Sequence, residues 1–295
     1  MKKIVFLGLC FAGVLQALPL VNPADSVMYT NGIFWHKGDR SSDWPCTDDC
    51  WLDSFSMRFG FYGDYVFNRN LKVRHGFNPA GNVTYQSGGS LIKTTLSTNA
   101  GTMCVNFCDW IEAYVAFGVT NINWQLNSSD LGYSNPFVLD VAFIPSVSYT
   151  VGAAAPIYQQ GGFILGVQAQ YFYLNGDSGQ LISGPAISPS QYFNQDTAKY
   201  LEYQGAIAAS YNFESEYLSF IPFVGIQFSG VDWNLTKIDN ILNLGSVIGF
   251  PHAKEQKVVG WTLGNSIILC DRGGVTAEAR FANEKALHVS GQLVF

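Results

Sequence analysis

The residues with the most reactive side chains in this chain are its cysteines. Two pairs, Cys46 with Cys50 and Cys104 with Cys108, share the spacing C-x-x-x-C, and Cys270 stands alone. In an exported protein such cysteines are disulfide candidates. The sixth cysteine, Cys10, lies in the N-terminal signal described below, so five remain after its removal, and an odd number leaves a thiol for an intermolecular bridge. The same spacing would suit zinc, but no histidine lies beside either pair. The spacing alone does not define which cysteines pair.

No familiar catalytic motif accompanies the cysteines. The four histidines, His36, His75, His252 and His288, lie far apart and outside any H-E-x-x-H pattern. The chain also lacks the G-x-S-x-G, Walker and dinucleotide-binding fingerprints. We therefore predict no enzymatic activity and no cofactor. The alternative is a barrel lipase whose serine, histidine and orienting polar residue come together from distant parts of the chain.

The N-terminus has the three parts of a secretory signal. Lys2 and Lys3 precede an uncharged apolar run of twelve residues over 4–15, and Gln16-Ala17 supplies a small residue for signal peptidase. That run is too short to span a bilayer, which takes about 20 residues of helix. We predict a signal peptide over 1–17, then an N-terminal segment over 18–53 that carries the first cysteine pair. A short anchor or a buried helix is the alternative.

The composition of the remaining chain indicates a membrane protein without apolar helices. Hydrophobic residues make up 48% and charged residues 13%, whereas soluble proteins average roughly 25% charged residues. Beyond the signal, no apolar stretch reaches the length of about 18 residues that a membrane helix needs. A closed β-barrel is the remaining way to cross a bilayer, because closure satisfies every backbone group without water. The acidic net charge of −6 gives no support to nucleic-acid binding.

Apolar and polar side chains alternate along much of the chain. Because successive side chains of a strand point to opposite faces, an alternating segment has one apolar and one polar face. The polar face is poor in charge and rich in Gln, Asn, Ser and Gly, which favours a membrane barrel over a soluble β-sandwich. Pro145, in a fuller apolar run over 137–151, is expected at a bulge or a rim. The alternating segments are 54–67, 111–119, 163–173, 201–213, 224–229, 275–281 and 287–295.

Residues 54–295 are therefore predicted to form an all-β, transmembrane antiparallel β-barrel. At about 15–20 residues per strand with its connection, the wall would have about 12–16 strands, a number that favours a pore. The long connections 175–199 and 231–257 either fold as loops or hold weaker strands. The final residue, Phe295, is typical of the terminal aromatic that barrel assembly requires. Six charged residues on the polar parity are candidates to line the pore, with a rim position as the alternative: Arg58, Asp64, Glu112, Glu202, Glu278 and Arg280.

Several blocks of sequence point to one protein family. They are 16–19 (QALP), 22–24 (NPA), 31–35 (NGIFW), Pro45-Cys46 with Cys50, the strongest block 56–69 (SMRFGFYGDYVFNR), and the C-terminal hairpin over 276–289 with Phe295. These blocks resemble the chlamydial major outer membrane porin family. Residues 80–250 match that family only in pattern, and this chain is shorter than its best-known members. The resemblance implies a homotrimeric pore in the outer membrane of a Gram-negative, chlamydia-like bacterium, with disulfide cross-links to other cysteine-rich envelope proteins.

Together these features predict an outer-membrane porin through which small hydrophilic solutes and ions diffuse passively. Selectivity in such a pore follows from its bore and from the charge of its lumen. A structural or adhesive barrel, cross-linked by disulfides and without significant conductance, is the alternative from a different class. A channel specific for one small molecule is a third hypothesis. Conductance distinguishes the first two.

Overall fold

The computed structural model describes residues 22, 55–77, 91–107, 111–127, 138–183, 191–215, 218–235, 249–269 and 273–294. Within these ranges no helix is long and apolar enough to cross a membrane. The strands are β1 (Phe55–Arg69), β2 (Leu71–Phe77), β3 (Lys93–Phe107), β4 (Ile111–Asn127), β5 (Val138–Phe143), β6 (Ser146–Gln160), β7 (Phe163–Ser183), β8 (Gln191–Tyr211), β9 (Phe213–Glu214), β10 (Leu218–Leu235), β11 (Gly249–Glu255), β12 (Val259–Leu269), β13 (Gly273–Phe281) and β14 (Glu284–Val294).

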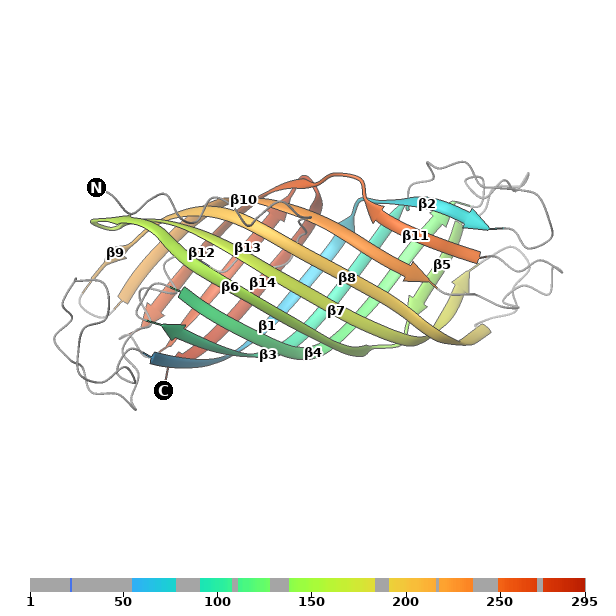
Figure 1. Cartoon of the computed structure of the whole chain (residues 1–295), viewed down its shortest axis with the longest axis horizontal. Coiled ribbons are helices and arrows are strands. Elements are labelled where there is room, and N and C mark those ends of the chain that lie inside the picture. The colour runs from blue at the N-terminus through green and yellow to red at the C-terminus, as the bar shows by residue number, and fades with distance from the viewer. Residues whose placement is uncertain are drawn as a thin grey trace.

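Ten of these strands close into an antiparallel ring. The strands are strongly tilted to the long axis of the barrel (Figure 1). The pairing runs β1–β3–β4–β6–β7–β8–β10–β12–β13–β14 and returns to β1. The predicted antiparallel β-barrel is confirmed, but its wall has ten positions where we expected about 12–16. The difference comes from strand length, since β7 and β8 have 21 residues each and β4 has 17.

Three interrupted segments of the sequence contribute strands to the wall where the structure describes them: 137–151, 175–199 and 231–257. β5 and β6 share one wall position, because both pair with β4 and β7. Pro145 lies at the break between them, as expected of a residue that has no N–H to donate to the ladder. In the described parts of 175–199 and 231–257, strands β7, β8, β10 and β11 continue. The second of the two readings, weaker strands instead of loops, is therefore the observed one.

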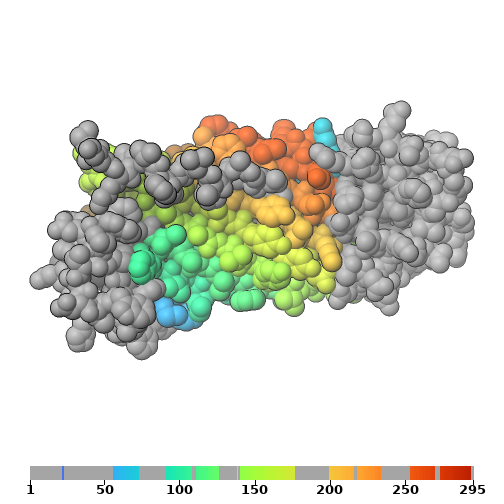
Figure 2. Space-filling model, in the orientation of Figure 1, coloured from blue at the N-terminus to red at the C-terminus, as the bar shows by residue number. Residues whose placement is uncertain are grey.

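Side-chain alternation separates the outer and inner faces of the wall. On the outside, large apolar side chains such as Phe61, Phe117 and Leu263 are 58, 66 and 60% exposed. On the inside, polar side chains of the opposite parity, such as Thr98 and Gln168, are buried. Strands β4, β6, β7 and β8 lie side by side without a gap, in part on the face shown in Figure 2. An apolar outer surface around a polar interior suits a wall that stands in lipid.

The barrel narrows at the end where β2, β5 and β11 lie (Figure 1). There β2 pairs directly with β11, and β13 and β14 no longer take part because their hairpin ends at Asn283. The backbone N–H of Asn70 donates to the Asn283 carbonyl at 3.3 Å, and the N–H of Leu91 donates to the Leu71 carbonyl at 3.0 Å. The wall at this end follows the order β3, β4, β5, β7, β8, β10, β11 and β2, which is eight positions, and the Leu91–Leu71 bond links β2 to the residues just before β3. Eight strands enclose just enough space for side chains to fill.

Asn22 lies inside the barrel, against strands β10 and β12. Its side-chain N–H groups donate to Ser266 Oγ at 2.8 Å and to the Ile221 carbonyl at 3.3 Å, and the residue is buried. This one described residue of the N-terminal segment therefore lies in the lumen. The predicted signal peptide over 1–17, the rest of 18–53, and Phe295 lie outside the described residues.

Candidate functional site: the lumen of the barrel

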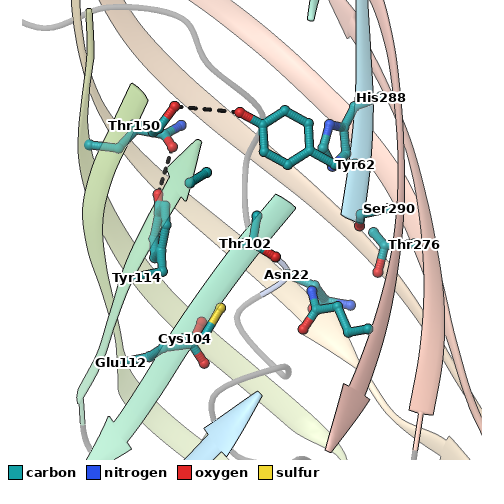
Figure 3. A pocket seen from close by; sticks show the side chains of 13 residues that line it. Asn22, Tyr62, Thr102, Cys104, Glu112, Tyr114, Thr150, Thr276, His288 and Ser290 are labelled. Atoms are coloured by element: carbon teal, nitrogen blue, oxygen red, sulfur yellow. Dashed lines mark hydrogen bonds between the residues drawn. The ribbon is translucent and has the colours of Figure 1, made fainter. Parts of the chain in front are cut away.

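We call the part of the lumen that the ring of ten strands encloses the ten-position part. It contains a narrow cavity lined by polar and aromatic side chains. Tyr62 of β1, Cys104 of β3, and Glu112 and Tyr114 of β4 point into it (Figure 3). Across the lumen the Tyr62 hydroxyl lies 3.4 Å from the Thr150 hydroxyl of β6. About 50 Å³ of this cavity is open to the centres of water molecules, which is room for a few waters.

A chain of amide hydrogen bonds runs around the inner wall beside this cavity. Gln168 Nε2 donates to the Tyr114 hydroxyl, which donates to Gln170 Oε1, both at 2.6 Å. Gln170 then donates to Gln204 at 2.8 Å, and Gln204 donates to Gln227 at 3.2 Å. The chain links β4, β7, β8 and β10, and it satisfies polar groups that would be costly to bury without partners. It also presents neutral donors and acceptors to the lumen.

The Tyr114 ring needs a glycine beneath it, and this gives a first testable prediction. A Cβ atom at Gly152 would lie 2.4 Å from the Tyr114 ring and 2.8 Å from Gln170 Cβ, whereas a Cβ atom at Gly291 would meet nothing within 4 Å. Valine is favoured in strands, so only the close contact penalises it. We expect Gly152→Val to destabilise the barrel by about 1–3 kcal/mol and Gly291→Val to have little effect. The fraction of folded protein, measured by heat-dependent gel mobility, checks this; equal effects would contradict it.

All six charged residues that alternation assigned to the lumen have buried side chains on the inner face. They are Arg58, Asp64, Glu112, Glu202, Glu278 and Arg280. Arg58 forms an ion pair with Glu112 and donates to Gln292 at 2.7 Å. Arg280 lies 2.8 Å from an Asp64 carboxylate oxygen, 3.8 Å from Glu278, and also pairs with Glu284. Arg58 and Arg280 are therefore paired with acids, and the pairs Arg58–Glu112 and Arg280–Asp64 each reach over one intervening strand.

Arg69 is the centre of a second group of charges, at the junction of the ten-position and eight-position parts. Its guanidinium lies 2.8 Å from Glu202, 3.3 Å from Glu255 and 3.7 Å from Glu284. It also donates to the Tyr200 hydroxyl at 2.9 Å, and Tyr200 in turn donates to Glu202 at 2.9 Å. We call these five residues the Arg69 hub. Because Arg69 lies on β1 and Glu202 lies on β8, two strands that are not neighbours in the wall, the Arg69–Glu202 pair crosses the lumen.

The simple alternation rule misses Arg69, and the reason is a β-bulge. From Arg58 to Val66 the even-numbered residues of β1 point inward. The register against β14 then shifts between Val66 and Asn68, and such an extra residue exchanges the two faces. Arg69 therefore points inward, although strict period two places it in lipid. The charge of Arg69 could have indicated its inward orientation, because an unpaired arginine facing lipid would be costly.

The eight-position end of the lumen is filled by aromatic side chains. Trp233 of β10 is in contact with three other rings: Phe143 at 5.8 Å, Tyr200 at 5.9 Å and Trp124 at 6.5 Å between centroids. Phe172 of β7 continues the group, 5.9 Å from Tyr200. We call these five residues the aromatic plug. In contrast to the polar inner face of the wider part of the barrel, this end is packed with side chains like a core.

Of the five cysteines predicted to form disulfides, only Cys104 belongs to the described residues. It is buried on the inner face of β3 and lines the cavity of Figure 3. Cys46, Cys50, Cys108 and Cys270 lie outside the described residues, so the predicted disulfides stay predictions. In the described part of the chain, no three His, Cys, Asp or Glu residues are placed to hold a metal ion.

Comparison with known proteins agrees with the sequence blocks described above. Residues 1–78 match the family described as Chlamydia major outer membrane protein. The whole chain is 26% identical to a major outer membrane porin of Chlamydia pneumoniae over 395 aligned positions, and 25% identical to the serovar B major outer membrane porin of Chlamydia trachomatis over 402, with 100% of both chains covered in each case. Among solved structures, the β domain of the Bordetella autotransporter Brka aligns with a TM-score of 0.44 at 7% identity, over 79% of this chain and 98% of that one.

The closed ring, its apolar outer surface and its polar interior define an outer-membrane β-barrel. Over its full length the chain is similar to the chlamydial major outer membrane porins. It has 295 residues for 395 aligned positions, so at least 100 of these positions are gaps in this chain.

Proposed function

We propose that this protein is a porin through which small hydrophilic solutes and ions cross the outer membrane by passive diffusion. The observation that carries the proposal is a closed barrel with a polar inner wall in a chain related over its full length to major outer membrane porins. Water-sized molecules can be accommodated beside the amide chain, where neutral donors and acceptors replace part of their hydration. No covalent step and no cofactor enter this function, and we propose no enzymatic activity.

The pore of this proposal is narrow. Ten wall positions lie near the eight that side chains can fill, and well below the 16–18 that leave a wide aqueous channel. The Arg69 hub and the aromatic plug occupy the lumen in series. Permeation therefore requires movement of inward side chains, and the largest solute that passes should be small.

Swelling of proteoliposomes tests the proposal and the size limit together. We expect vesicles that contain the folded barrel to swell in glycerol and not in sucrose, because sucrose is far larger than the cavity beside Tyr114. Empty vesicles and vesicles with heat-denatured protein are the controls. Absence of swelling in both solutes, from barrels shown to be folded, would favour the structural or adhesive barrel instead.

Assembly belongs to the same proposal. A homotrimer and disulfide links to other cysteine-rich envelope proteins are what the resemblance implies for this chain. Four of the five candidate cysteines lie outside the described residues. The outer face of the wall presents apolar side chains to lipid or to another copy of the chain. Gels of whole envelopes with and without reductant would separate linked from unlinked protein.

A further inference from the structure

Among the described residues, the buried charges around Arg69 and Arg280 do not balance. Two guanidinium groups, Arg69 and Arg280, are surrounded by five carboxyl groups: Asp64, Glu202, Glu255, Glu278 and Glu284. With every group ionised, the formal charge of this cluster is three negative. The separate pair of Arg58 with Glu112 is neutral.

Two carboxylates of the Arg69 hub each have one oxygen that the protein does not use. The Oε1 atoms of Glu202 and Glu255 are buried and accept no hydrogen bond from the described residues. The Oε2 atoms of both groups face Arg69. A buried carboxylate oxygen without a donor is costly. A cation beside these two oxygens would remove that cost, whereas an anion would increase it.

The position of the hub makes this imbalance important for transport. The hub lies where the wall passes from ten to eight positions, so a solute that traverses the whole lumen must pass it. Charges act more strongly there than in bulk water, because the surrounding protein excludes solvent. Narrow pores take their ion preference from the charged side chains at such constrictions, and acidic ones select cations.

We infer that the lumen of this barrel admits monovalent cations in preference to anions, and that Glu202 and Glu255 of the Arg69 hub determine this preference. The inference rests on the proposed porin function and adds the class of solute and the residues that select it. It follows from the surplus of carboxyl groups and from the two unused oxygens at the junction.

The reversal potential across a planar bilayer with a KCl gradient tests the inference. We expect the wild-type barrel to be K⁺-selective. Loss of one negative charge at about 4 Å from a permeating ion weakens its attraction by about fivefold even in water-like surroundings. The variants Glu202→Gln and Glu255→Gln should therefore lower the ratio of K⁺ to Cl⁻ permeability severalfold. Arg280→Gln, which removes a positive charge from the same cluster, should raise that ratio.

Glu214→Gln is the matched control, because Glu214 of β9 is an exposed acid at the end of the barrel opposite to β2 and β11 (Figure 1), away from the Arg69 hub. Its permeability ratio should equal that of the wild type. A conducting wild-type barrel that prefers Cl⁻, or a ratio that responds to Glu214→Gln as strongly as to Glu202→Gln, overturns the inference and leaves the porin proposal intact. Folded barrels that carry no current overturn both. The sign of the wild-type potential decides the inference even if the lumen variants fail to fold.

Discussion

Replacing Trp233 with alanine is expected to raise the single-channel conductance of the barrel by about threefold or more. Trp233 contacts three of the other four rings in the aromatic plug, and it is 1% exposed. Its removal leaves a cavity in the eight-position end, which is the narrowest part of the lumen. Water and ions can then enter a region that aromatic side chains otherwise fill.

Trp261→Ala is the matched control for this experiment. Trp261 of β12 is 52% exposed on the outer face, so its removal leaves the lumen unchanged. Burial of a tryptophan contributes about 3–5 kcal/mol in a packed interior, so heat-dependent gel mobility must first show that Trp233→Ala is folded. A folded Trp233→Ala barrel with wild-type conductance would mean that ions do not pass through the aromatic plug.

Replacing Arg69 with methionine is expected to destabilise the barrel by about 3–5 kcal/mol. The substitution leaves the carboxyl groups of Glu202, Glu255 and Glu284 buried without the guanidinium that they share. Glu202→Gln should cost less, because Arg69 keeps two carboxylate partners. The two substitutions differ in cost because Arg69 is the shared partner of three carboxylates, whereas Glu202 is only one of the three.

The temperature at which the folded band disappears on a gel measures this loss. Lys72→Met is the matched control, since Lys72 of β2 is an exposed cation three residues from Arg69. If Arg69→Met melts at the same temperature as Lys72→Met, the cross-lumen pair contributes nothing to stability. The double variant Arg69→Met with Glu202→Leu should recover part of the loss, because apolar pairs can replace buried ion pairs.

Much of the wall could be predicted from alternation alone. The parity that places Phe59 and Phe61 outside and Arg58 and Asp64 inside is the observed one. A strand repeats every two residues, so a single buried or exposed face is visible in the sequence without any partner. The same rule extended through β4 and β10 would have placed Trp124 and Trp233 inside, on the parity of Glu112 and Gln227.

Other features depend on contacts that no local pattern encodes. The number of wall positions depends on how long each strand continues, and β7 and β8 continue through residues whose composition is typical of loops. The pairing of β2 with β11 joins segments about 180 residues apart and produces the eight-position end. The bulge after Val66 that turns Arg69 inward is a property of the register against β14.

The conductance of the whole barrel tests the central claim most directly. The protein would be purified from outer membranes of an expression host, shown to be folded, and added to a planar bilayer in KCl. We predict small, discrete current steps, which grow larger in Trp233→Ala and stay unchanged in Trp261→Ala. Folded barrels that insert and carry no current in any of these three forms would contradict the porin proposal.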